Sequence, residues 1–124
     1  MTRDIQESTK KAQPADTNLV VVVGTVSKDA VVTEATDGRV YTSFDVVCRL
    51  GGVRTVVPVT VARGLDVPAD SRVAVLGRAE KRFFPSGGGF VSRTDIRAES
   101  VTVVRRSSQV SRLLATAVEH LSAP

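Results

Sequence analysis

Residues 40–49 read VYTSFDVVCR, and apolar and polar side chains alternate along them. One face of an extended chain would carry Val40, Thr42, Phe44, Val46 and Cys48. The other face would carry Tyr41, Ser43, Asp45, Val47 and Arg49. A period of two is typical of a half-buried antiparallel strand, which packs one face on a core. Turn signals lie on both sides, at Asp37-Gly38 and Gly51-Gly52, so we expect antiparallel neighbours for this strand.

Four further main strands are predicted at 19–26, 54–61, 72–84 and 90–104. The first continues as extended chain over 30–35, and the last two are joined by a flexible tip, PSGGG, at 85–89. Gly24 predicts a bulge or a sharp bend, and Pro58 predicts an edge or a bulge, because proline donates no ladder hydrogen bond. Five strands with closely spaced turns predict a small Greek-key barrel or sandwich at residues 18–106.

Both ends of the chain differ from this Val-rich middle. Residues 1–17 contain almost no apolar side chains, and we interpret them as a flexible N-terminal arm. Residues 107–124 include a short amphipathic helix, because its apolar side chains are spaced by three and four residues. That apolar stripe consists of Val110, Leu113, Leu114, Ala117, Val118 and Leu121. It would cover either the open end of the barrel or a second copy of the chain.

Composition excludes several classes of function. Valine fills 24 of the 124 positions, which favours an all-β fold. The single cysteine, Cys48, allows no internal disulfide and is interpreted as a small core side chain. The single histidine, His120, is interpreted as a solvated surface group. No apolar run reaches the ~20 residues of a membrane helix, and no phosphate-binding loop or catalytic constellation is present. We therefore expect a cytoplasmic protein that is not an enzyme and has no cofactor, metal or membrane contact.

The charge balance permits a polyanionic partner. The formal net charge is +4, and 13 of the 17 basic residues are arginine. The planar guanidinium of arginine pairs well with phosphate and also stacks on flat rings. Basic charge alone is a weak indication of nucleic-acid binding, because many basic domains of this size bind no acidic partner.

The most informative cluster is RAEKRFF at 78–84, in which basic and aromatic residues are interleaved. On a strand, Arg78, Arg82 and Phe84 share one face, whereas Lys81 and Phe83 share the other. The returning strand adds Phe90, Arg93 and Arg97. Cations for the backbone and flat rings for the bases are what single-stranded nucleic acid requires. Alternatively, one phenylalanine caps the barrel and the charges are only solvated.

Neighbouring strands could extend such a groove. Tyr41, Arg49 and Arg54 are expected on the polar faces of their strands, where they could contact nucleic acid. A sheet face that is only solvated would show the same residues.

Three motifs occur in an order that resembles one known family. They are VVGTV at 22–26 with Asp29, Ala30 and Val32, then FDVVCR at 44–49, then DSRVAVLGR at 70–78. They are similar to the V-G-x-L-x-x-D-P-E-V, F-x-L-A-x-x and G-x-x-V-x-V-x-G-x-L segments of bacterial single-stranded-DNA-binding (SSB) proteins. The resemblance covers residues 19–104. Each motif alone is weak, and the three in register are moderately specific.

The resemblance implies an OB-fold, a homo-oligomer (dimer or tetramer), and single-stranded DNA wrapped across basic grooves. By position, Phe84 matches a stacking aromatic and Arg82 matches a phosphate contact. Arg63 matches a basic residue after the third strand. The resemblance also implies a role in DNA replication, repair and recombination.

The chain departs from the family at the other stacking positions. These fall at Gly51-Gly52, Thr55 and Val61, so three of the four expected rings are missing. At about 1–3 kcal/mol per stacked base, binding should be much weaker than in the family. The long tail with an acidic tip is also missing. We therefore expect a divergent paralogue that binds single-stranded DNA, or RNA, weakly. The alternative is an OB-fold adaptor for protein partners that has lost most DNA binding.

Overall fold

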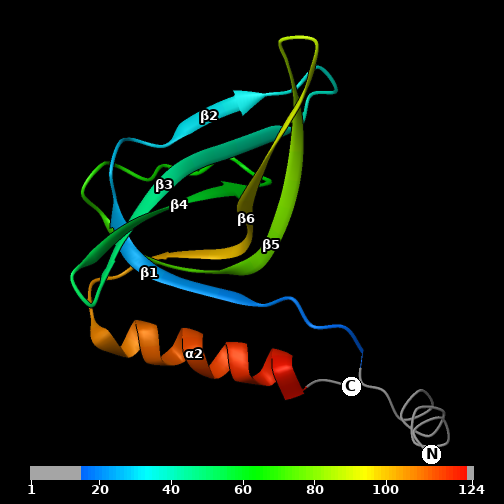
Figure 1. The fold of residues 1–124 in the computed structure, drawn as a ribbon. Helices are drawn as coiled ribbons and strands as arrows, with labels where there is room; N and C mark the ends of the chain where they lie inside the picture. Colours follow the sequence, from blue (N-terminus) through cyan, green and yellow to red (C-terminus); the bar gives the residue numbers. More distant parts are fainter. Residues whose placement is uncertain (1–14, 123–124) are drawn as a thin grey trace, which may run out of the picture.

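The computed structural model describes residues 15–122, apart from the side chains of Phe84 and Ser122. Most of the predicted N-terminal arm, residues 1–14, therefore lies outside the described residues. Residues 15–122 form six strands and one helix (Figure 1). The elements are β1 (Val20–Val26), β2 (Val31–Glu34), β3 (Val40–Leu50), β4 (Val53–Val61), β5 (Arg72–Ser86), β6 (Gly89–Val103) and α2 (Ser107–Ser122).

Five of these strands form a closed barrel. The order is β1-β5-β6-β4-β3, and β1 closes the ring by pairing with β3 through Thr25↔Val47 and Val26↔Val46. All pairings are antiparallel except that between β4 and β6. β2 lies outside the ring and pairs only with β3 among the described strands. This is the predicted five-stranded OB-fold barrel, with β2 as the predicted extended continuation of the first strand.

The core is built mainly from valine, as the alternating pattern predicted. Val26, Val46, Val59, Val61, Val73 and Val75 are all almost completely buried. Phe44 is the one aromatic side chain among the buried residues that the structure describes. Val47 is also buried, although its face was expected to be solvated, because β1 closes against β3 at this residue.

Pro58 lies where β4 has only β3 beside it, since the pairing with β6 begins at Val59. The predicted edge position is therefore confirmed.

Gly24 lies at the point where β1 closes the barrel. A Cβ atom there would lie 2.4 Å from the carbonyl oxygen of Val47 and 2.7 Å from a methyl carbon of Val46. The glycine therefore permits the close approach of β1 to β3. No bulge is recorded in the pairings of β1; the irregular pairing falls between Leu76 and Gly77 in β5.

Helix α2 packs on the outer wall of the barrel (Figure 1). Leu113 and Ala117 are buried against Ala74 and Leu76 of β5, with Val21 and Val23 of β1 packed around them. Of the two partners expected for the helix, the open end of the barrel is therefore wrong, and a second copy of the chain stays a prediction. The reason is that β5 alternates two apolar sets, one facing the core and one facing outward, and the helix covers the outward set. Leu114 and Leu121, from the same predicted stripe, remain exposed.

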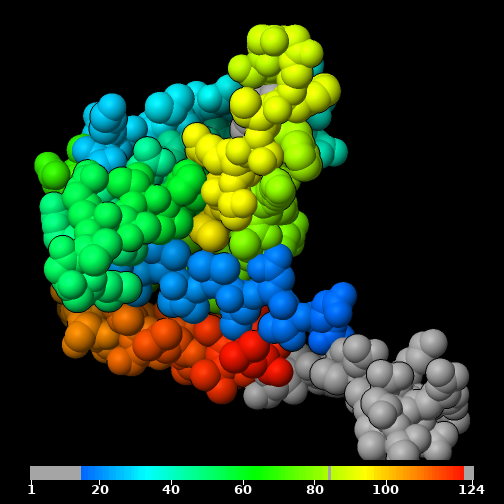
Figure 2. All heavy atoms as spheres, viewed as in Figure 1, coloured from blue at the N-terminus to red at the C-terminus, as the bar shows by residue number. Residues whose placement is uncertain are grey.

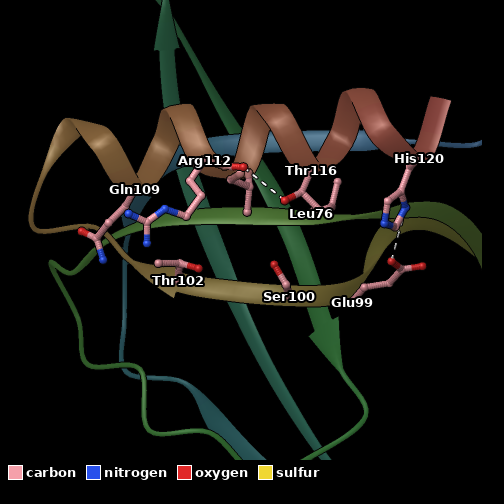
Figure 3. A pocket seen from close by; sticks show the side chains of 9 residues that line it. Leu76, Glu99, Ser100, Thr102, Gln109, Arg112, Thr116 and His120 are labelled. Carbon is pink, nitrogen blue, oxygen red and sulfur yellow. Dashed lines mark hydrogen bonds and ion pairs between the residues drawn. The ribbon is translucent and has the colours of Figure 1, made fainter. Parts of the chain in front are cut away.

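Polar contacts stabilise the start of α2, and one further polar contact joins α2 to β6. The side-chain oxygen of Gln109 accepts hydrogen bonds from the backbone N–H groups of Arg105 and Arg106, at 2.6 and 2.9 Å. Such a contact satisfies backbone donors at a helix start. Farther along, the Nδ1 atom of His120 lies 3.9 Å from a carboxylate oxygen of Glu99 (Figure 3).

Within residues 15–122, no helix combines the length and apolar character needed to cross a membrane.

Candidate nucleic-acid interface

A groove crosses the outer wall of the barrel between β2 and β3 on one side and β5 and β6 on the other. It is lined by Thr33, Tyr41, Ser43, Thr60, Arg82, Arg93 and Arg97. These side chains come from five strands, and on β3 and β4 they alternate with core residues. The groove therefore follows from the same period-two pattern that builds the core. It presents hydroxyl groups, three arginines and one aromatic ring on a single surface.

The register of β5 and β6 places basic residues directly opposite one another. Arg78 pairs with Arg97, and Arg82 pairs with Arg93, while Glu80 and Asp95 form the pair between them. All six side chains belong to the groove face, because they are spaced by two residues along each strand. Arg78 and Arg82 are separated by about 13 Å along the strand. Four arginines thus surround two carboxylates on this face.

Asp95 forms part of the groove floor. It is 2% exposed, and its Oδ2 atom accepts hydrogen bonds from Thr60 Oγ1 at 3.2 Å and from an Nη atom of Arg82 at 3.4 Å. A buried carboxylate needs such partners, because removing it from water without them is costly. Arg82, the predicted phosphate contact, is therefore oriented from below by Asp95.

Glu80 connects the other two arginines. One of its carboxylate oxygens lies 3.1 Å from Nε of Arg78, and the other lies 3.6 Å from an Nη atom of Arg97. The guanidinium of Arg97 also lies over the ring of Tyr41, with its central carbon 5.6 Å from the ring centroid. Tyr41 and Arg97 therefore form a stacked pair at the edge of the groove. Tyr41, predicted on the polar face of its strand, does reach the groove.

Beyond the barrel, residues 81–94 of β5 and β6 pair with each other and project as a two-stranded arm (Figure 2). Lys81 lies over the ring of Phe83, with its Nζ atom 5.7 Å from the ring centroid. This contact agrees with the predicted shared face of the two residues. Phe83 is 66% exposed, so it does not cap the barrel. Phe90 is also exposed and lies on the Phe83 face, because its partner across the arm is Pro85.

Phe84 pairs with Val91 through the backbone, but its side chain lies outside the described part of the structure. Three other predicted contacts do not line the groove. Arg49 and Arg54 are partners across the far end of the β3–β4 hairpin. Eight residues separate Arg49 from Tyr41, or about 26 Å along the strand. Arg63 is exposed after β4, and its carbonyl oxygen accepts a hydrogen bond from Thr42.

Sequence reasoning missed the acidic and hydroxyl members of the site. Glu80 and Asp95 were not recognised as the partners of the groove arginines, and Thr60 was not recognised as a floor residue. The period-two pattern places Glu80 on the arginine face, but the position of Asp95 opposite it depends on the strand register.

The chain has the fold of an OB-fold barrel protein. The groove on the outer wall of this barrel is lined by basic side chains. No protein-family model and no curated protein matches the sequence. Among the described residues, no cluster of histidine, cysteine and acidic side chains is arranged to hold a metal ion.

Proposed function

We propose that this chain binds single-stranded DNA, with little dependence on sequence, through the groove between β2–β3 and β5–β6. The observation that carries this proposal is that two pairs of arginines lie directly opposite each other across β5 and β6, Arg78 with Arg97 and Arg82 with Arg93. Like charges placed directly opposite one another destabilise a sheet. Glu80 and Asp95 offset part of this repulsion within the chain, and a polyanion that lies along the groove would offset more of it. The same residues would act as a binding surface and would perform no covalent chemistry.

The groove chemistry favours a single strand over a duplex. Arginine provides forked donors for phosphate oxygens, and Tyr41 and Phe84 are aromatic residues on which unpaired bases could stack. A duplex keeps its bases stacked inside and offers only its backbone to such rings. Because the rings are few, most of the affinity comes from phosphate contacts. RNA, which shares the phosphates and the unpaired bases, is the second nucleic acid to test.

The proposal is tested by fluorescence anisotropy of a labelled dT30 oligonucleotide titrated with the full chain. An RNA of the same length and a duplex of the same length serve as competitors. We expect micromolar or tighter binding of dT30 and weaker competition by the duplex. Equal competition by the duplex would show a general affinity for polyanions and would contradict the proposed site.

Replacing Phe84 by alanine is expected to weaken dT30 binding at least tenfold. The reason is the loss of one stacked base, worth about 1–3 kcal/mol. Phe90→Ala is the matched control, because it removes a ring of the same size from the Phe83 face of the arm. Anisotropy gives both affinities, and circular dichroism checks the fold. An unchanged affinity for Phe84→Ala would remove this residue from the site.

We further propose that the protein acts as a homo-oligomer, either a dimer or a tetramer. This proposal is supported by the exposed side chains of Val31 and Val32 on β2, which is last in the strand order and pairs only with β3 among the described strands. Light scattering coupled to size-exclusion chromatography measures the mass, and a monomer across the micromolar range would contradict it.

A second candidate function is an adaptor that binds protein partners. It is favoured by the exposed side chains of Leu114 and Leu121, which are seven residues apart and so lie on the same side of α2. The two candidates differ in their response to salt, because phosphate binding weakens steeply as salt rises, whereas apolar contacts do not.

A further inference from the structure

The further inference concerns the carboxylate of Glu80, and it rests on the proposed function. We infer that, before nucleic acid binds, Glu80 occupies the position of a backbone phosphate in the groove, and that a bound phosphodiester replaces it between Arg78 and Arg97. The inference assigns one phosphate subsite to these two arginines. It also assigns Glu80 the role of an internal competitor for that subsite.

The geometry at Glu80 resembles that of a bound phosphate group. Its two oxygens are divided between two guanidinium groups, at 3.1 Å from Arg78 and 3.6 Å from Arg97. A phosphodiester also presents two charged oxygens to neighbouring donors, and arginine forks bind carboxylate and phosphate in the same way. The subsite is therefore formed before nucleic acid arrives, with an anion of this chain inside it.

The surroundings of Glu80 allow the exchange. The side chain is 33% exposed and that of Arg78 is 52% exposed, so both reach solvent. Glu80 can swing outward because its side chain is partly exposed on the groove face. Arg97 is 26% exposed and stays in place because it lies over the ring of Tyr41. The cation therefore remains fixed while its anionic partner changes.

Asp95 differs from Glu80 in this respect. It is 2% exposed and is held by Thr60 from the adjacent strand, so it cannot leave the groove floor without a change in the barrel. The two acidic residues of the arginine face thus have separate roles. Asp95 orients Arg82 permanently, whereas Glu80 holds its arginines only until a phosphate binds.

The competition predicts that removing the Glu80 charge strengthens binding. Glu80→Gln keeps the size of the side chain and removes the anion, so we expect dT30 to bind five- to tenfold more tightly at low salt. The slope of log Kd against log salt should become steeper by about 0.7, the value for one further phosphate neutralised on a single strand. Anisotropy titrations at four salt concentrations measure both quantities.

The matched control is Glu99→Gln, which makes the same charge change two residues from Arg97. Glu99 faces His120 of α2 (Figure 3), and it lines a cavity distinct from the groove, which Arg78 also lines. It therefore reports the general effect of removing one nearby negative charge, for which we expect less than a twofold change. A gain for Glu80→Gln that disappears in the Arg78→Ala background would localise the competition to this subsite.

Three results would overturn the inference. If Glu80→Gln and Glu99→Gln change the affinity equally, the effect is general electrostatics. If Glu80→Gln weakens binding while its melting curve is unchanged, the carboxylate supports the bound state. In both cases the wild-type protein still binds dT30, so the proposed function stands. If neither the wild type nor Glu80→Gln binds dT30 at low salt, both the proposed function and the inference are wrong.

Discussion

The double substitution of Arg93 and Arg97 by glutamate should weaken dT30 binding by about a hundredfold or more at low salt. It changes the charge of the groove by four units and removes one arginine from each of the two cross-strand pairs. Because each neutralised phosphate contributes to both affinity and salt dependence, the slope of log Kd against log salt should also fall by about 1.4. Both side chains line the groove, and neither lies in the core.

The matched control is the double substitution of Arg105 and Arg106 by glutamate. These two residues are exposed at the start of α2, where they line a different cavity, and the net-charge change is the same. We expect at most a fewfold loss for this variant. If the two double variants lose affinity equally, the protein responds to total charge and the groove has no special part in binding.

Replacing Gly77 by alanine should destabilise the barrel by about 3 kcal/mol. A Cβ atom at this position would lie 2.2 Å from the carbonyl oxygen of Arg97 and 2.8 Å from the Cα atom of Ala98. Both atoms belong to the backbone of β6, so the clash cannot be relieved by a side-chain rotation. The two strands would have to separate at the irregular pairing between Leu76 and Gly77. Urea denaturation followed by circular dichroism measures the change.

Gly89→Ala is the matched control for Gly77→Ala. Gly89 begins β6, and the nearest atom to a Cβ there would be the carbonyl oxygen of Ser86, at 4.0 Å. We expect the urea midpoint of this variant to stay close to that of the wild type. A midpoint for Gly77→Ala that matches the Gly89→Ala midpoint would show that β5 and β6 are less closely packed than described here.

The barrel could be predicted because its pattern is local. Alternation over residues 40–49 identified the core-facing side chains of β3, and glycine pairs identified the turns. The predicted tip at 85–89 was longer than the observed turn. Pro85 and Ser86 still pair with Phe90 and Gly89, so only Gly87 and Gly88, both with positive φ, make the turn.

The groove could be predicted only in part, because it depends on strand register. The arginines of residues 78–97 were correctly placed on one hairpin, but the positions of Arg93 and Arg97 opposite Arg82 and Arg78 follow from the turn at Gly87-Gly88. Alternation also placed Arg49 and Arg54 on the polar faces of their strands, yet both lie at the far end of the β3–β4 hairpin from Tyr41. The partner of the helix could not be predicted for a similar reason, because an apolar stripe shows that a helix is covered without showing which surface covers it.

One titration decides whether the groove binds single-stranded DNA. Labelled dT30 is titrated with the wild-type chain by fluorescence anisotropy, from about 20 to 300 mM salt, and log Kd is plotted against log salt. For the four arginines of the groove face, partly neutralised by two carboxylates, we predict micromolar or tighter binding at the lowest salt and a slope of about 1.4 to 2.8. No binding at the lowest salt, or an affinity that does not change with salt, would contradict a phosphate-binding groove.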